Sequence, residues 1–347
     1  MKIAGVITET GSQKSALDWL KSYAAGHYPD ATAATAALYF ASLDKEDSDI
    51  SPYLARLDDI CADLERTIAD AAGPEGGLPR VMDLAIALQQ VIPGYHGYQG
   101  DAENYDDTDN ANLMCVIDRK RGLPVALALL YLHAAAHCGL DMIGIDFPGH
   151  FLLRLEAHGE RVLIDPFHNG LVLGAAELRE LLKAFQGLDA ELQPEHYREA
   201  TDQTILLRLQ NNIKVRALRS GDLAYATTIL ERCLIIAPDE PGLWHQSGTL
   251  HARLSNDEKA LAAFEKFLAL NHDPRHQQRI RSLAAELRDR IAGIKPNQTA
   301  ASKTPAPPRD DDTVVRLHPK KTPSASETSA RFPNDTSPLP PDDLPPA

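Results

Sequence analysis

The sequence has few cysteines, and none of them belongs to a recognisable pair. The 347-residue chain contains four, which are widely scattered and form neither a CxxC motif nor a metal-ligand spacing: Cys61, Cys115, Cys138 and Cys233. Disulfide-built secreted domains and cysteine zinc sites place their cysteines much closer together. We therefore expect reduced and mostly buried thiols in a cytoplasmic protein.

Long apolar runs and an excess of basic residues are also missing. No segment reaches the about eighteen unbroken apolar residues that a membrane span needs, and the apolar run near Met1 is too short for a secretory signal. The formal net charge is −14 at pH 7, whereas nonspecific nucleic-acid binding needs clustered Lys and Arg. The sequence therefore disfavours both a membrane partner and a nucleic-acid partner.

Proline is concentrated at the C-terminal end. Residues 295–347 hold 12 of the 24 prolines, mixed with Ser, Thr and Asp, and their seven basic and seven acidic side chains cancel. Such a composition cannot bury enough apolar surface to fold, so we predict a disordered tail. Its short island at residues 314–318 is either a docking segment or part of a plain solvated tail, and we favour the solvated tail. The remaining chain is long enough for two domains.

Residues 1–100 read as a helical N-terminal layer. Ser51 followed by Pro52 is typical of a helix start, and apolar residues then recur at three- and four-residue spacing up to Ile68. Further helices are predicted around residues 15–24, 31–43 and 81–92, the last ending at Pro93 and Gly94.

Residues 101–200 change in character. A helix predicted over residues 125–138 is apolar on nearly every side and stops at Gly139, so we expect it to be buried. Strands are predicted over residues 142–147, 151–155 and 161–165. A buried helix followed by an antiparallel sheet indicates an α+β core.

Charged residues crowd the start of this segment. The loop at residues 101–109 holds five acidic residues, without the spacing or the glycine of an EF-hand, which favours a solvated acidic loop. Arg119, Lys120 and Arg121 stand just before the apolar helix. They either balance the acidic loop or form, with His150, a pocket for an anion or a carboxylate terminus, because helix N-termini favour anions.

A 34-residue period follows. Ala226, Leu230 and Pro238 correspond to Ala260, Phe264 and His272, as in tetratricopeptide repeats. We predict helix-turn-helix units over residues 211–238 and 242–271 and a capping helix over 277–291, within a repeat segment at 205–291. Such repeats either complete the core or recruit a protein or peptide partner.

Three stretches carry a resemblance to a known family: RKRGLPVALALLYL at residues 119–132, FPGHFLLR at 147–154 and DPFHNG at 165–170. They resemble bacterial transglutaminase-like proteins of the SirB type, in which this domain precedes tetratricopeptide repeats, and the similarity covers about residues 30–290. The resemblance implies a papain/transglutaminase-like core whose triad has Cys at the start of the buried helix, then His and Asp on successive strands. It assigns the last two positions to His150 and Asp165.

The triad cysteine is absent from its position. When Gly122 is aligned with the family's glycine, Leu123, Pro124 and Val125 stand where the nucleophile belongs, and none of them can attack a carbonyl. Cys115 precedes the helix by about two turns, and Cys138 lies about 20 Å from its start. Neither is at the helix end that lowers a thiol pKa, so we expect no papain-like catalysis.

Two classes of function stay open. The favoured one is a noncatalytic regulatory or interaction protein in which His150 and Asp165 hold a pocket. The alternative is a cysteine-type hydrolase or acyltransferase acting on amide or thioester bonds, in which His150 and Asp165 work with Cys115 or an unrecognised nucleophile. No cofactor is expected. His133 and His137 are spaced like a zinc-chelating pair but have no evident third ligand, so no metal site is expected either. The oligomeric state is left open.

Overall fold

The computed structural model describes residues 11–45, 49–72 and 77–293. It divides into two compact units, the first ending at residue 212 and the second beginning at residue 213. The expected disordered tail at 295–347, with its apolar island, lies outside the described residues. None of the helices within the described ranges is long and apolar enough to cross a membrane.

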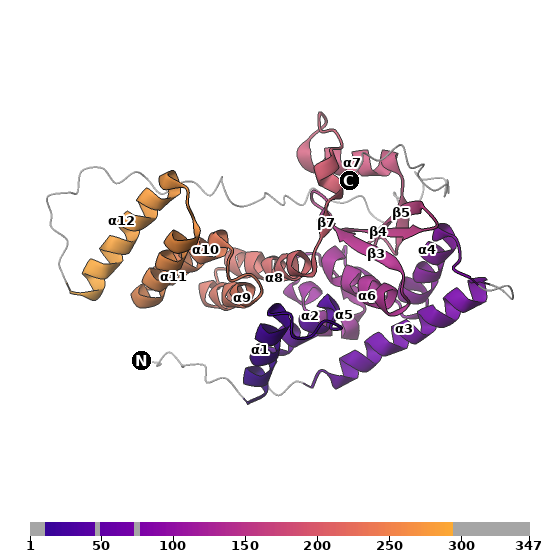
Figure 1. Cartoon of the computed structure of the whole chain (residues 1–347), viewed down its shortest axis with the longest axis horizontal. Helices are drawn as coiled ribbons and strands as arrows, with labels where there is room; N and C mark the ends of the chain where they lie inside the picture. The colour runs from indigo at the N-terminus through magenta and orange to yellow at the C-terminus, as the bar shows by residue number, and fades with distance from the viewer. Residues whose placement is uncertain (1–10, 46–48, 73–76, 294–347) are drawn as a thin grey trace. The chain divides into compact units, whose positions relative to one another are not determined.

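Helices form the N-terminal part of the first unit (Figure 1). Residues that the pattern placed inward on the third of them are buried: Leu57, Ile60 and Leu64. This helix packs against the fourth helix and against the central helix of the core. The bounds are α1 Gly11–Ala24, α2 Ala33–Ser42, α3 Ser51–Ala72, α4 Val81–Gln89 and α5 Leu113–Arg119.

The prediction that Pro93 and Gly94 end the fourth helix was wrong. The chain continues from α4 into a π-helix at Gln90–Tyr95, with Pro93 inside it. The backbone N–H of His96 donates to the Val91 carbonyl at 3.0 Å, which is the wider hydrogen-bond step of a π-turn. Because proline has no N–H to donate, the wider turn accommodates it, and the preceding Val91 and Ile92 stay buried.

A five-stranded antiparallel sheet forms the second layer, with strand order β6-β5-β4-β3-β7. Its central hairpin turns at His158 and Gly159, both at positive φ, as two-residue hairpin turns require. The α+β fold is therefore confirmed. The bounds are β3 Asp141–Ile145, β4 Leu152–Ala157, β5 Glu160–Asp165, β6 Leu171–Leu173 and β7 Glu199–Ala200.

Helices cover both faces of this sheet (Figure 1). The central helix α6, Pro124–His137, packs against β3 and β4 together with α4 and is buried along most of its length. Alternate strand residues such as Leu152 and Leu163 pack instead against α7, Ala175–Gln186, through Leu178 and Leu182. The sheet thus lies between two helical layers.

A short parallel pair of strands joins the acidic loop to the sheet. Strand β1, Gln99–Gly100, pairs with β2, Arg121–Gly122. The N–H of Gly100 donates to the Phe167 carbonyl at 3.1 Å, and a Cβ at Gly100 would lie 2.5 Å from that oxygen. Only glycine permits this approach. Two 3-10 turns, Thr108–Ala111 and Pro194–Tyr197, complete the irregular segments.

The described part of the second unit consists of helices and the short turns that connect them. Helix α8, Asp202–Arg219, runs across the boundary between the units, and the helices that follow it pack in succession. The structure contains the predicted helix-turn-helix pairs and capping helix, but the first pair begins at Asp202 instead of residue 211, and the capping helix begins at Pro274 instead of residue 277. The bounds are α9 Leu223–Ile236, α10 Pro241–Arg253, α11 Asp257–Leu270 and α12 Pro274–Ile291.

Candidate functional site

The structure brings His150 and Asp165 together. Nε2 of His150 donates to Oδ2 of Asp165 at 2.8 Å. The expectation that both residues lie on strands was wrong for His150, which occupies the loop before β4, whereas Asp165 is the last residue of β5. The loop turns at Gly149, whose φ is +71° and whose Cα faces the Phe185 ring, so a side chain there would clash.

Asp165 is buried and accepts four hydrogen bonds. His168 adds an N–H from Nδ1 to Oδ2 at 2.7 Å. The backbone N–H groups of Phe167 and His168 donate to Oδ1 at 2.9 and 3.3 Å. The carboxylate is therefore fully satisfied, as a buried charge requires. Sequence reasoning missed His168, although its place three residues after Asp165 in the DPFH motif was visible.

The Asp165 carboxylate and the imidazoles beside it shift one another's pKa values. Burial by itself would raise the pKa of Asp165, but the charges and hydrogen bonds of His150 and His168 outweigh it and hold the pKa well below its usual range. Burial would lower the pKa of His150, and the Asp165 carboxylate more than compensates, so the net direction is upward. The Asp165 carboxylate therefore favours the protonated form of His150, and the two imidazoles favour the ionised form of Asp165.

The two imidazole rings lie almost parallel, with centroids 5.9 Å apart and planes at 5°. The side chain of His150 is 16% exposed and that of His168 is 43% exposed, against 2% for Asp165. Within the described ranges, these three residues are the one group of three potential metal ligands whose donor atoms all lie within 4.8 Å of one another. Solvent reaches the cluster on the His168 side.

Arg208 on α8 anchors the loop that carries His150. One guanidinium nitrogen donates to the His150 carbonyl at 2.7 Å, and another pairs with Asp146. The guanidinium also lies over the Phe151 ring, 5.5 Å from its centroid. Burial lowers the pKa of Arg208 to about 10, still well above neutral. Sequence reasoning missed this residue because it lies in a helix assigned to the repeat segment.

Tyr131 on α6 lies beneath the loop that follows Asp165. A Cβ at Gly170 would come within 2.9 Å of its hydroxyl, which fixes glycine there. Burial, and then the negative charge of Asp165, raise the pKa of this phenol. The hydroxyl has no hydrogen-bond partner among the described residues. Gln89 donates to the Gly170 carbonyl at 2.5 Å, so α4 and α6 both hold the loop in place.

The N-terminal end of α6 carries no nucleophile. Leu123 is the N-cap residue, with no side-chain cap hydrogen bond, and Pro124 opens the helix. Both are buried, as is Val125. Hydrocarbon side chains therefore occupy the place where a triad would need a thiol.

The four thiols lie in other places. Cys61 and Cys138 are neighbours on α3 and at the end of α6, with the Cys138 Sγ 4.0 Å from the Cys61 carbonyl oxygen, and Cys233 is buried in the second unit. Burial is the largest cause that raises their pKa values, to about 12, 11 and 11 respectively. Burial also raises the pKa of Cys115. All four thiols are therefore protonated at neutral pH.

Arg119 pairs with the acidic loop. Its guanidinium lies 2.8 Å from Asp107, 3.2 Å from Asp109 and 3.5 Å from Asp101. Lys120 adopts a left-handed conformation that ends α5, and Arg121 donates to the Lys120 carbonyl at 3.0 Å. The charge of Arg119 is thus balanced by the acidic loop.

The histidine pair on α6 forms a different contact. Nδ1 of His133 is 2.8 Å from the Thr32 hydroxyl. Burial lowers the pKa of His133. Neither His133 nor His137 belongs to a group of three potential metal ligands in the described part of the chain.

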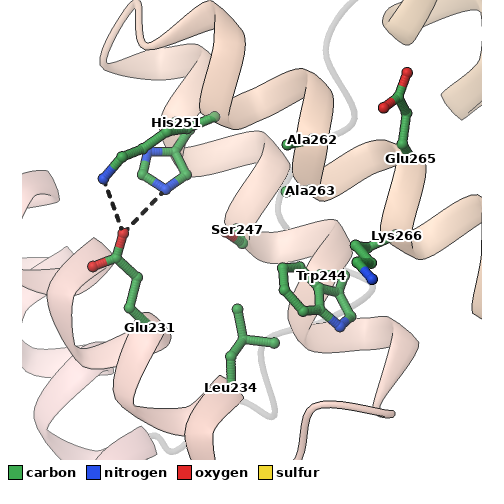
Figure 2. A pocket seen from close by; sticks show the side chains of 10 residues that line it. Glu231, Leu234, Trp244, Ser247, His251, Ala262, Ala263, Glu265 and Lys266 are labelled. Carbon is green, nitrogen blue, oxygen red and sulfur yellow. Dashed lines mark hydrogen bonds and ion pairs between the residues drawn. The ribbon is translucent and has the colours of Figure 1, made fainter. Parts of the chain in front are cut away.

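The second unit has a groove of about 690 Å³ between α9, α10 and α11 (Figure 2). Trp244 and Leu234 supply apolar surface, and the Trp244 indole donates to the Pro238 carbonyl at 2.6 Å. At one end, Glu231 forms an ion pair with Lys259 at 3.3 Å and lies 3.5 Å from Nε2 of His251. The groove thus combines an apolar floor with charged edges.

Comparison with known proteins agrees with this architecture. Residues 51–211 match the family profile of the transglutaminase-like superfamily, and residues 213–285 match that of the tetratricopeptide repeat. A UPF0162 protein of Xylella fastidiosa is 30% identical over 177 residues, or 50% of this chain and 63% of the relative. A UPF0162 protein of Vibrio cholerae is 31% identical over 173 residues, or 50% of this chain and 64% of the relative.

A third relative carries the SirB name. Protein SirB1 of Salmonella typhimurium is 26% identical over 185 residues, or 52% of this chain and 68% of the relative. The chain spans less than two thirds of the length of the Xylella and Vibrio relatives. Residues 51–211 are a transglutaminase-like domain and residues 213–285 a tetratricopeptide-repeat segment, in a chain related to the UPF0162 and SirB1 proteins.

Proposed function

We propose that this chain is a noncatalytic regulatory protein of the cytoplasm that binds a protein or peptide partner through its repeat segment. The observation that carries the proposal is the start of α6, where Leu123 and Pro124 stand in place of a nucleophile. The His150–Asp165 pair then serves to hold the β3–β4 loop rather than to activate a thiol.

The chemistry of the cysteines supports this proposal. A triad works only when its nucleophile lies within hydrogen-bond reach of the base and is easily deprotonated. Burial, and then the negative charges of Asp109 and Asp118, raise the pKa of Cys115, which is the thiol nearest in sequence to the start of α6. A thiol in that setting is a poor nucleophile at neutral pH.

The groove in the second unit supports the choice of partner. Trp244 and Leu234 offer apolar surface, and aromatic side chains in partly desolvated pockets contribute most to binding energy. Lys259, Glu265 and Lys266, all on α11, add charged groups to the lining of the groove. Tetratricopeptide repeats generally mediate protein–protein interaction, and this groove suits a peptide segment that inserts an apolar side chain beside Trp244.

The alternative is a hydrolase or acyltransferase, and one observation favours it: the His150–Asp165 hydrogen bond is intact and buried. A thiol-directed ester probe distinguishes the two functions. We expect the full-length chain to remain unlabelled at neutral pH. Stoichiometric labelling of Cys115 that disappears in His150→Ala would overturn the noncatalytic proposal, provided that the variant keeps the circular dichroism spectrum of the wild type.

The partner proposal has its own test. Trp19 and Trp244 are the two tryptophans of the chain, so Trp19→Phe leaves Trp244 as the single indole reporter. In that background, titration with a library of short peptides should change the Trp244 fluorescence, and binding should weaken by tenfold or more in Leu234→Ala. The matched control is Leu188→Ala, because Leu188 is 84% exposed in the first unit. Equal affinities in both variants would contradict the proposal.

A further inference from the structure

We propose that His150, Asp165 and His168 bind one divalent transition-metal ion, with Zn²⁺ as the probe. Two imidazole nitrogens and one carboxylate oxygen are a donor set typical of zinc and other first-row metals. This inference goes beyond the proposed function and does not depend on it, because partner binding through the second unit involves none of the three residues.

The donor atoms are already close to a ligand arrangement. Nε2 of His150 and Nδ1 of His168 lie 2.8 and 2.7 Å from the same oxygen, Oδ2 of Asp165. Ligand atoms at about 2.0–2.1 Å from a tetrahedral zinc are roughly 3.3 Å apart. Each nitrogen–oxygen distance would therefore open by about half an ångström as one metal ion replaces the two N–H protons. Small side-chain rotations are enough for this change.

Surrounding groups hold the three ligands in orientation. Oδ1 of Asp165 accepts the backbone N–H groups of Phe167 and His168, which leaves Oδ2 directed at the imidazoles. Arg208 donates to the carbonyl of His150 and so fixes its loop. Hydrogen bonds of this kind to the outer side of a metal ligand are what orient ligands in metalloproteins. The Arg208 charge is itself paired with Asp146, which limits its repulsion of a cation.

The site is accessible and incompletely filled by protein ligands. The side chain of His168 is 43% exposed, so an ion can enter from that side. Three protein ligands leave one position of a tetrahedral ion for water or for an anionic group. The competing pair on α6 is less suitable, because His133 Nδ1 is engaged with Thr32 and no third ligand joins the pair within the described ranges.

The test is a titration of the tag-free, full-length chain with Zn²⁺ after dialysis against a chelator. We expect one equivalent to bind, with at least tenfold weaker binding in His168→Asn. His158→Asn is the matched control, since His158 lies in the exposed β4–β5 turn, where its Nε2 is 2.8 Å from the Leu78 carbonyl oxygen. Co²⁺ bound to the wild type should show the visible absorption of a tetrahedral site, and His168→Asn should lose it.

His168 is the first choice for substitution because it is the most exposed of the three ligands, so its variant is the least disruptive to the fold. Two further variants, His137→Asn and Cys138→Ser, guard against binding at the other end of α6. The proposal is overturned if the wild type binds no more Zn²⁺ than His168→Asn, or if binding persists in His168→Asn and disappears in either of the other two. Labelling by the thiol probe is measured separately, so failure here leaves the noncatalytic proposal standing.

Discussion

Oδ2 of Asp165 lies 2.8 Å from Nε2 of His150, at the inner end of a loop that Arg208 also holds. In a cysteine triad, such a pair orients the imidazole toward a thiol. Here the start of α6 offers hydrocarbon instead, and the pair remains buried. A buried pair of this kind must be satisfied by hydrogen bonds, so its first measurable role is in stability.

Replacement of Asp165 by Asn should lower the free energy of unfolding by about 3–5 kcal/mol, because it removes the buried charge that accepts hydrogen bonds from two imidazoles and two backbone N–H groups. Urea denaturation measures the change. Asp141→Asn, at the exposed start of β3, should change the same quantity by less than about 0.5 kcal/mol. Similar losses of unfolding free energy in the two variants would show that Asp165 and its two histidines contribute no more to stability than an exposed residue does.

The same carboxylate predicts acid sensitivity. Its pKa is lowered on folding, so its contribution to stability is present above the ordinary value of 3.8 and is lost as the pH falls below it. The wild type should therefore lose stability more steeply than Asp165→Asn below about pH 4. Parallel curves for the two proteins would contradict this assignment.

Replacement of His150 by Gln should change how the free energy of unfolding depends on pH above 6.5. The pKa of His150 is raised on folding, so its contribution is complete below the ordinary value of 6.5 and is lost as the pH rises through the raised value. With a chelator present, the stability advantage of the wild type over His150→Gln should shrink as the pH increases above 6.5. An advantage that grows with pH would reverse the sign and refute the prediction. His158→Gln serves as the control.

Replacement of Tyr131 by Phe should leave stability unchanged or raise it by up to about 1 kcal/mol, because the buried hydroxyl has no hydrogen-bond partner among the described residues. Thermal and urea unfolding measure this. Tyr23→Phe is the contrasting variant: the Tyr23 hydroxyl donates to Asp202 at 2.9 Å, so its removal should cost about 1 kcal/mol. A marked loss in Tyr131→Phe would point to a role for the phenol beside Asp165.

Replacement of Gly248 by Ala should destabilise the second unit. The added Cβ would lie 2.5 Å from ring carbons of Phe264, and overpacking of this kind costs about 1–3 kcal/mol, more than the helix propensity that alanine gains. Gly242→Ala on the same helix would meet only the end of the Glu240 side chain, whose carboxylate lies 3.3 Å from the added Cβ and can shift. We expect the Gly242 variant to keep or increase stability, and equal losses would argue against the close packing of α10 on α11.

Much of the fold follows from local patterns. Apolar spacing along α3 and the uniform apolarity of α6 predict their burial, because the positions of neighbouring residues along a helix decide which face of the helix each side chain lies on. The 34-residue period predicts the helix pairs of the second unit. The π-helix around Pro93 was not predicted, because continued burial of Val91 and Ile92 depends on packing that the local proline signal does not contain.

The sequence by itself determined the order of elements, the transglutaminase-like and repeat segments, and the lack of a cysteine at the start of the apolar helix. Only the tertiary structure decided that His168 joins His150 on Asp165, and that Arg208, 58 residues further along the chain, holds the His150 loop. The physical reason is the distance along the chain over which each kind of interaction acts. Helix and strand preferences act between near neighbours, whereas the partners of a buried charge are chosen when the folded chain excludes water and every polar group must find a hydrogen bond.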